Sequence, residues 1–228
     1  LSESLSSMGH SVSWWTSNFD HYRKRPRRRA PITVSYGTDI SIHLIPALGY
    51  SRNVSPQRLV NHFQLGRRFS KMAKAASYEP DIILASLPIV DMAAAAVSFA
   101  SSRGIPVIVD IRDLHPDALV DLVPRPVRPV ARSLLCPMTR QVSTALKAAN
   151  GICAISRDFL DWGLNLAARP AEAGDAVFPL GYPKTRMPEA SVASARDDGI
   201  NLGVDPSKKI VWFIGHMSRV IDLDGAIA

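Results

Sequence analysis

The sequence predicts an α/β fold in which a parallel sheet carries helices on both faces. Short apolar runs rich in Val and Ile alternate along the chain with longer Ala-rich runs, which is the pattern of β-α-β units. Most of the short runs are continuously apolar, as expected of strands that are covered on both faces. The 228 residues and the 46% hydrophobic content are typical of a globular chain, which excludes disordered and fibrous classes.

Strands are expected where Val, Ile, Leu and aromatic residues cluster over a few positions. In chain order they are residues 11–16, 41–45, 81–85, 106–111, 151–155, 176–179 and 210–214.

Three helices are expected between these strands. The first begins after Ser55, because a hydroxyl N-cap followed by proline is a strong helix start. The second spans 91–102 and ends at Gly104, and the third spans 129–149, where Pro137 is expected to kink or divide it. Residues 185–209 change to Pro, Gly, Ser and Asp and are expected to form a linker with one short helix. The stripe of the first helix that is expected to face the core consists of Leu59, Phe63, Phe69, Ala73 and Ala76.

Several classes of protein have no support in the sequence. No apolar run approaches the roughly 20 residues of a membrane-spanning helix, and residues 1–8 lack the pattern of a signal peptide. Cys136 and Cys153 stand without a CxxC or metal-ligand spacing, so we expect two buried thiols in a reducing compartment and no metal. The motifs of dinucleotide-binding enzymes, P-loop proteins, zinc proteases and serine hydrolases do not occur.

The net charge of +7 comes from one segment. Residues 21–30 hold six basic side chains and no acidic one, and without these six, 21 basic residues face 20 acidic ones. Such a cluster suits an anionic membrane, a nucleic acid or plain solvation, and the lack of aromatic residues between the charges argues against nucleic acid. The cluster consists of Arg23, Lys24, Arg25, Arg27, Arg28 and Arg29.

Ionisable residues gather directly after the predicted strand 106–111. Asp110, Arg112, Asp113, His115 and Asp117 fall within eight positions of each other, at a strand end where ligands of open α/β sheets bind. Burying so many charges is costly unless they are used. A structural alternative stays open, in which Arg112 pairs with Asp110 or Asp113 and His115 shapes a turn before a proline.

Two further strand ends carry candidate ligand-binding residues. Ser156 follows the strand 151–155, where it either caps the next helix or helps to hold an anion at the helix N-terminus. After the strand 210–214, Gly215 allows a close approach of backbone to ligand, and Arg219 suits a phosphate.

Taken together, the chain resembles glycosyltransferase family 4 of the GT-B fold, the type that builds bacterial surface polysaccharides. The segments that carry the likeness, in the family's order, are GHSVSWWTSNFDHYRKRPRR, YEPDIILASLP, GIPVIVDIRDLHPD, GICAIS, LGYP and VWFIGHMSRVIDLDGAIA. The resemblance implies a Rossmann-like acceptor domain over 1–184 whose first strand lies before Leu1. It also implies a linker over 185–207, and over 208–228 the first strand and turn of a domain for the nucleotide sugar.

The resemblance also implies a reaction. A glycosyl group passes, with retention, from a nucleoside-diphosphate sugar to an acceptor hydroxyl, the sugar nucleotide being a substrate and no cofactor being needed. Asp113 then orients the sugar or accepts a proton beside Arg112 and His115, while Gly215 and Arg219 match the family's diphosphate turn. The lysine that many family members have after that arginine is absent here. The paired-glutamate motif, which holds the ribose of the nucleotide in the family, is absent as well.

Partners and location follow from the same resemblance. The acceptor is expected to be a lipid-linked or other glycan, and the basic segment 21–30 is expected to hold a cytoplasmic enzyme at the inner face of the membrane. A UDP-sugar epimerase of the same architecture and a catalytically inactive truncated product are the alternatives. Because the donor side is incomplete, the 228-residue chain alone is expected to show negligible transferase activity.

Overall fold

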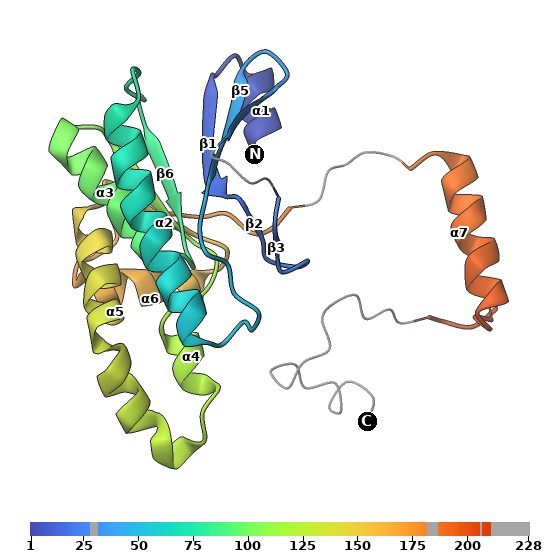
Figure 1. Cartoon of the computed structure of the whole chain (residues 1–228). Helices are drawn as coiled ribbons and strands as arrows, with labels where there is room; N and C mark the ends of the chain where they lie inside the picture. Colours follow the sequence, from blue (N-terminus) through green and yellow to red (C-terminus); the bar gives the residue numbers. More distant parts are fainter. Residues whose placement is uncertain (28–31, 182–186, 206, 211–228) are drawn as a thin grey trace. The chain divides into compact units, whose positions relative to one another are not determined.

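The computed structural model describes residues 1–27, 32–181, 187–205 and 207–210. The chain divides into two compact units, Leu1–Leu180 and Gly181–Ala228 (Figure 1). In the described part of the second unit, helix α7 (Glu189–Asn201) occupies the segment that was expected to be a linker with one short helix. The predicted strand at 210–214 lies, apart from its first residue, outside the described residues.

The first unit alternates strands and helices as the sequence predicts. Its first half contains α1 (Ser2–Ser7), β1 (Val12–Ser17), β2 (Phe19–Asp20), β3 (Arg25–Pro26), β4 (Ile32–Tyr36), β5 (Ile40–Ile45) and α2 (Pro56–Ala75). Its second half contains β6 (Ile83–Ser86), α3 (Val90–Arg103), β7 (Val107–Ile111), α4 (Asp117–Asp121), a 3-10 turn (Arg125–Val127), α5 (Arg128–Ala148), β8 (Gly151–Ala154), α6 (Arg157–Ala167) and β9 (Ala176–Val177).

The described strands form a four-stranded parallel sheet, a three-stranded mixed sheet and a separate two-stranded pair. Strands β6, β7, β8 and β9 pair in that order, and all are parallel. Strands β1 and β5 are also parallel, and β4 pairs with β5 as an antiparallel hairpin strand. Strands β2 and β3 form a separate antiparallel pair.

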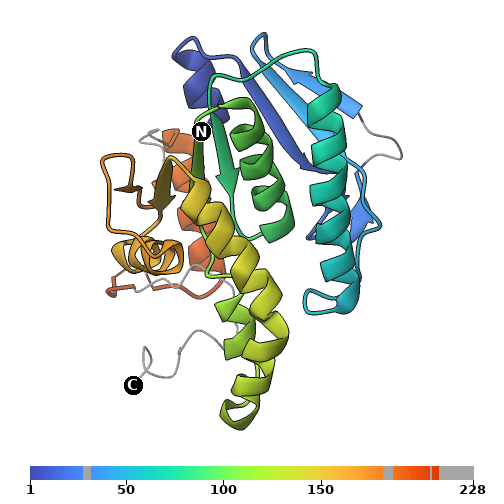
Figure 2. The same cartoon turned by 90° about the vertical axis from the view of Figure 1, so that its left-hand side faces the viewer.

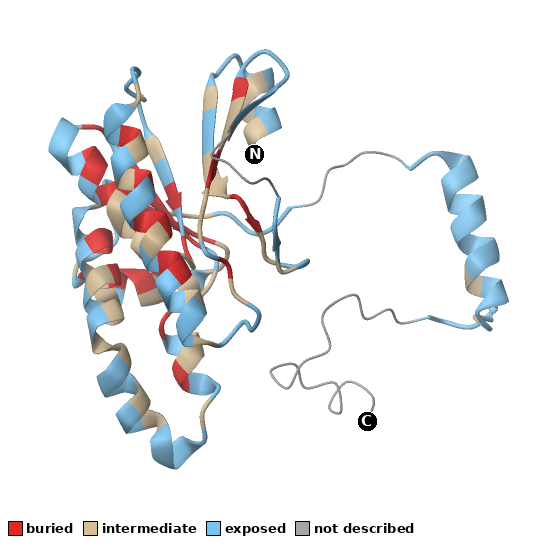
Figure 3. Ribbon diagram, in the orientation of Figure 1, coloured by how far each residue is buried: buried red, intermediate tan, exposed pale blue. Residues whose placement is uncertain are grey.

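Helices cover both faces of this arrangement. α2, α3 and α5 lie side by side on one face, and α1 lies on the other, against β1 and β5 (Figures 1 and 2). α2 and α3 approach closely, because a Cβ on Gly66 of α2 would stand 2.6 Å from the carbonyl oxygen of Asp91. The most deeply buried side chains lie between the helices and strands (Figure 3) and include Ile45, Leu65, Val107, Ile111, Leu146 and Ile152.

The helix boundaries confirm the capping signals. Ser55 Oγ accepts a hydrogen bond from the backbone N–H of Arg58 at 3.3 Å and so caps α2. Gly104 ends α3 with a left-handed φ of 67°. Pro137 does not divide α5, which continues through it as one helix, and the alternative of a kink at this residue stays a prediction.

The predicted core stripe of α2 is wrong in its first half. Leu59 and Phe63 are 44% and 53% exposed, whereas the polar Asn61 and His62 are buried. Apolar periodicity fails here because the inward side of this half of the helix faces other polar residues, described below, instead of a hydrophobic core.

Three other expectations are corrected. Strands β1 and β6 are not covered on both faces, since Trp14 is 50% and Leu84 45% exposed. The hairpin strand β4 was not expected, because its sequence follows the basic segment directly. Cys153 is buried as predicted, but Cys136 is half-buried, because it lies on the less packed half of α5.

Candidate functional site

Asp110, the fourth residue of β7, connects the predicted site to the strands on either side of β7. Its Oδ2 accepts hydrogen bonds from Arg112 Nε at 2.5 Å and from Ser86 Oγ of β6 at 3.2 Å. On the other side, Cys153 Sγ of β8 lies 3.6 Å from Asp110 Oδ1. Burial, and the nearby Asp110 carboxylate, raise the pKa of Cys153 to about 12, so this thiol stays protonated. Arg112 therefore makes the ion pair that the structural alternative foresaw.

Asp113 and His115 lie together just beyond the end of β7. His115 Nδ1 stands 3.2 Å from Asp113 Oδ2, a close contact that is not an aligned hydrogen bond. The Asp113 side chain is 44% exposed and that of His115 is 11% exposed. The adjacent imidazole holds the pKa of Asp113 below its usual value, although burial opposes this shift. The pair thus presents an ionised carboxylate to solvent.

The first half of α2 places the guanidinium of Arg58 and the imidazole of His62 near Asp113 and His115. Arg58 Nε lies 3.4 Å from His62 Nε2, and Arg58 Nη1 donates to the backbone carbonyl of Asn53 at 2.8 Å. Burial is the main cause that lowers the pKa of His62 to about 4. The charge of Arg58 adds to this shift, followed by those of His115 and His21, so these groups lie within electrostatic range of His62.

The loop after β5 adds Tyr50 to these residues, and Tyr50 in turn contacts His21 and Arg58. His21 Nδ1 and the hydroxyl of Tyr50 form a hydrogen bond of 2.6 Å, and the guanidinium of Arg58 lies over the Tyr50 ring at 5.7 Å. Asn61 Oδ1 accepts the backbone N–H of Gly49 at 2.9 Å, which fixes this loop against α2. We call the resulting group the polar cluster; it consists of His21, Tyr50, Arg58, His62, Asp113 and His115.

Sequence reasoning found only two members of the polar cluster. Asp113 and His115 were predicted because they follow a strand directly. His62 and Arg58 were missed, because a helix was assumed to turn apolar residues inward. The signal was present, since Asn61 and His62 stand at inward positions of an otherwise amphipathic helix.

The remaining predicted residues take other places. Ser156 caps α6 by accepting from the backbone N–H of Phe159 at 3.4 Å, and its binding of substrate stays a prediction. Asp117 accepts a hydrogen bond from Trp162 Nε1 at 2.8 Å, which ties α4 to α6. Gly215 and Arg219 lie outside the described residues, as do Arg28 and Arg29.

The chemistry available at the polar cluster is that of proton acceptance and anion attraction. An ionised carboxylate accepts hydrogen bonds from hydroxyl groups, and a neutral imidazole offers one N–H donor and one acceptor nitrogen for hydrogen bonds. Across the described ranges, no three His, Cys, Asp or Glu side chains gather in a way that would hold a metal ion.

Lowering the pH is expected to destabilise the protein through His62. Its folded pKa of about 4 lies below the ordinary value of 6.5, so the stabilising contribution is complete above pH 6.5 and is lost as the pH falls toward 4. The loss of stability amounts to at most about 3 kcal/mol.

Urea unfolding at pH 7 and pH 5 should show a smaller pH dependence for His62→Gln than for the native protein. The exposed His10→Gln is the control, and equal slopes in both variants would contradict this prediction.

Comparison with known proteins identifies the family. A family model described as glycosyl transferase 4-like domain matches residues 1–180. The chain belongs to this family. The match spans every member of the polar cluster and confirms the resemblance seen in the sequence.

This glycosyltransferase 4-like chain is similar to a solved structure, that of sucrose-phosphate synthase from Thermosynechococcus elongatus. The TM-score is 0.50 and the sequence identity is 14%, and the alignment covers 88% of this chain and 91% of that chain. The likeness confirms the predicted α/β fold class. A search of curated proteins found no match. Within the described ranges, no helix combines the length and apolarity needed to cross a membrane.

Proposed function

We propose that this glycosyltransferase 4-like chain forms the acceptor-side lobe of a retaining enzyme. It places an acceptor hydroxyl for attack on a nucleoside-diphosphate sugar in the synthesis of a cell-surface or lipid-linked glycan. Asp113 orients or deprotonates that hydroxyl, and His115 sets the orientation of the carboxylate. The observation that supports this most is the half-exposed Asp113 carboxylate, which lies 3.2 Å from His115 Nδ1 and within electrostatic range of the cationic Arg58.

Physical chemistry favours this assignment of roles. Transfer of a sugar develops positive charge at the anomeric carbon and negative charge on the departing diphosphate. Asp113 remains ionised at neutral pH, because the pKa of its carboxyl lies below the usual range. It therefore accepts the hydrogen bond of a sugar hydroxyl, and Arg58 supplies a positive charge at the same edge of the sheet.

Acceptor binding is tested with the histidine side chains as reporters. The full chain is titrated with methyl glycosides of glucose, galactose, mannose and N-acetylglucosamine, and ring resonances are followed by NMR. At least one glycoside should shift the signals of His62 and His115, assigned with their Gln variants, and leave the exposed His10 unchanged. Shifts confined to His10 or His43, or no shift with any glycoside, would contradict the proposal.

Product analysis separates transfer from the alternatives. A radiolabelled panel of UDP- and GDP-sugars is incubated with the protein and a polyprenyl-linked sugar acceptor. Label in the lipid fraction supports transfer, whereas label in an isomerised sugar nucleotide without acceptor would instead show an epimerase.

We further propose that the enzyme works at the inner face of an anionic membrane. The hairpin of β2 and β3 carries the exposed Arg23, Arg25 and Arg27, and Tyr22 at its tip is 90% exposed. Lys24 lies over the Tyr50 ring at 4.7 Å. This segment is expected to bind lipid headgroups through its charge.

A second surface supports the same proposal. The first half of α5 extends beyond the rest of the unit (Figures 1 and 2) and exposes Val130 and Leu134 at 57% and 76%. Val127, in the 3-10 turn just before it, is 47% exposed. No acidic residue occurs between Leu122 and Arg157. Apolar side chains flanked by arginine alone are typical of a helix that lies in a lipid interface.

Replacing Arg23, Lys24, Arg25 and Arg27 by Gln is expected to weaken vesicle binding at least tenfold. Each basic residue near an anionic surface contributes about 1 kcal/mol at low salt. Cosedimentation with phosphatidylglycerol and phosphatidylcholine vesicles measures the change. A control variant neutralises the four exposed residues Arg67, Lys71, Lys74 and Lys147. Equal losses in both variants would show that total charge alone governs binding.

A further inference from the structure

Two cations converge on the ring of Tyr50. Lys24 Nζ lies 4.7 Å and the guanidinium carbon of Arg58 5.7 Å from the centre of this ring. Both side chains also contact Asn53, because Lys24 Nζ donates to its Oδ1 and Arg58 Nη1 donates to its backbone carbonyl at 2.8 Å. We call Lys24, Tyr50, Asn53 and Arg58 the dication site.

The two positive charges of the dication site are held by neutral partners. An aromatic ring and an amide contact them, and within the described ranges neither cation forms an ion pair with a carboxylate. Arg103 is different, since it lies over the Phe99 ring at 5.0 Å and pairs with Glu79. Like charges that lie close together repel each other unless an anion joins them, so this arrangement favours the binding of an anion.

Lys24 adopts a backbone conformation that lysine rarely takes. Its φ is 52°, in the left-handed region that glycine and asparagine adopt most easily. The Asp20 carboxylate holds the preceding turn by accepting the N–H groups of Tyr22 and Arg23 at 3.0 Å each. Lys24 is half-buried, whereas its neighbours Arg23 and Arg25 are exposed. A lysine in a place that suits glycine or asparagine indicates a role for its ammonium group.

The dication site joins the basic hairpin to the polar cluster. Lys24 lies in the turn between β2 and β3, while Arg58 lies in the first turn of α2. The charge of Arg58 contributes to the lowered pKa of Asp113, although the adjacent His115 is the main cause. An anion held at the dication site therefore borders the residues that form the candidate acceptor site.

Apolar side chains flank the dication site on the loop after β5. Leu48 and Val54 are 74% and 65% exposed, and in the chain they stand on either side of Tyr50 and Asn53. No acidic residue occurs over the range 40–78. A ligand that combines a diphosphate with a hydrocarbon chain can thus place its charge on the two cations and remove apolar surface from water. The polar ribose of a nucleoside diphosphate gains nothing from these apolar side chains.

We propose that the dication site binds the diphosphate group of a prenyl-type lipid diphosphate, whose hydrocarbon chain lies along Leu48 and Val54. Lys24 and Arg58 donate charge-assisted hydrogen bonds to its phosphate oxygens. The sugar that this diphosphate carries then lies at the polar cluster, where Asp113 meets its hydroxyl group. This last step rests on the proposed function, whereas the binding of the diphosphate does not.

Inorganic pyrophosphate and geranyl diphosphate test the site in the full chain. Both are titrated at low salt, and Kd is measured from the NMR signals of the His21 ring, assigned with His21→Gln. Lys24→Asn should weaken the binding of both at least tenfold, while its melting temperature equals or exceeds the native value, since asparagine suits a left-handed φ. Lys24→Arg keeps the charge and should bind both within threefold of the native protein.

The matched control is Arg67→Gln. Arg67 lies on α2, as Arg58 does, and stands over the Phe63 ring at 5.8 Å, so its loss should leave both Kd values unchanged. Equal losses in Arg67→Gln and Lys24→Asn would show that total charge alone attracts the ligand. That result, or native affinity in Lys24→Asn, would overturn the site.

UDP distinguishes a lipid diphosphate from a sugar nucleotide as the source of the diphosphate. Geranyl diphosphate should bind at least fivefold more tightly than UDP. The double variant Leu48→Ser, Val54→Ser should remove this difference and leave the Kd of pyrophosphate unchanged. Binding of UDP as tight as that of geranyl diphosphate would overturn the assignment to a lipid. If pyrophosphate binds and no methyl glycoside does, the proposed function fails and the dication site stands.

Discussion

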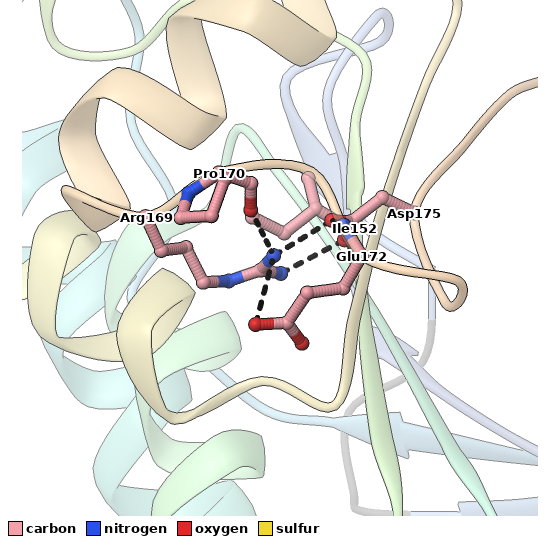
Figure 4. Close-up of polar contacts among 5 residues, drawn as sticks. All are labelled: Ile152, Arg169, Pro170, Glu172 and Asp175. Atoms are coloured by element: carbon pink, nitrogen blue, oxygen red, sulfur yellow. Dashed lines mark hydrogen bonds and ion pairs between the residues drawn. The ribbon is translucent and has the colours of Figure 1, made fainter.

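Asp175→Asn is expected to lower the free energy of unfolding by about 2 to 4 kcal/mol, because it breaks an ion pair at a buried carboxylate. The Asp175 side chain is 1% exposed, and Arg169 Nη1 and Nη2 donate to its two oxygens at 2.6 and 2.8 Å (Figure 4). The same carboxylate accepts the backbone N–H groups of Ile152 and Glu172, each at 2.8 Å. The loss stays below the largest values for buried pairs, because Arg169 retains 15% exposure.

Urea unfolding of the two proteins at pH 7 measures this effect. Glu172→Gln is the matched control, since Glu172 lies 3.9 Å from Arg169 and is 60% exposed, and it should cost at most about 0.5 kcal/mol. The Arg169 side chain is the main cause that lowers the pKa of Asp175 to about 2. The stabilisation is therefore complete above the ordinary value of 3.8 and is lost as the pH falls toward 2, where native protein and variant should converge. Equal losses for both variants at pH 7 would contradict the role of the pair.

Asp113→Asn is expected to weaken acceptor binding roughly 10- to 100-fold, since a hydrogen bond to a charged group contributes about 1.5 to 3 kcal/mol. The carboxylate is half exposed and already ionised, so the substitution removes the charge and changes the volume little. The NMR titration with the best methyl glycoside measures the change in Kd.

The control for this variant is Asp161→Asn. Asp161 lies on α6 and pairs with the exposed Arg157 four residues earlier, away from β7, and should leave the Kd unchanged. A circular dichroism spectrum equal to that of the native protein excludes unfolding as the cause. An Asp113→Asn variant that binds as tightly as the native protein would remove Asp113 from the acceptor site.

Local signals in the sequence were sufficient for most of the fold. Short runs rich in Val, Ile and Leu located β5, β7 and β8, and the caps Ser55 and Gly104 located ends of α2 and α3, because these signals depend on neighbouring residues. The hairpin strand β4 lacked such a signal. The polar cluster was found only where its members follow one strand. His21 reaches it through tertiary packing, which no local pattern encodes, whereas His62 stands at an inward position of α2 that was assumed to be apolar.

The positions of the two thiols have a practical consequence. Cys153 is held protonated between strands beside Asp110, whereas Cys136 is half-buried on α5. Maleimide reagents at neutral pH will therefore label Cys136 selectively, without removal of the other cysteine. A nitroxide placed there sits two residues beyond Leu134, and its accessibility to oxygen and to a nickel chelate reports whether this helix enters a bilayer.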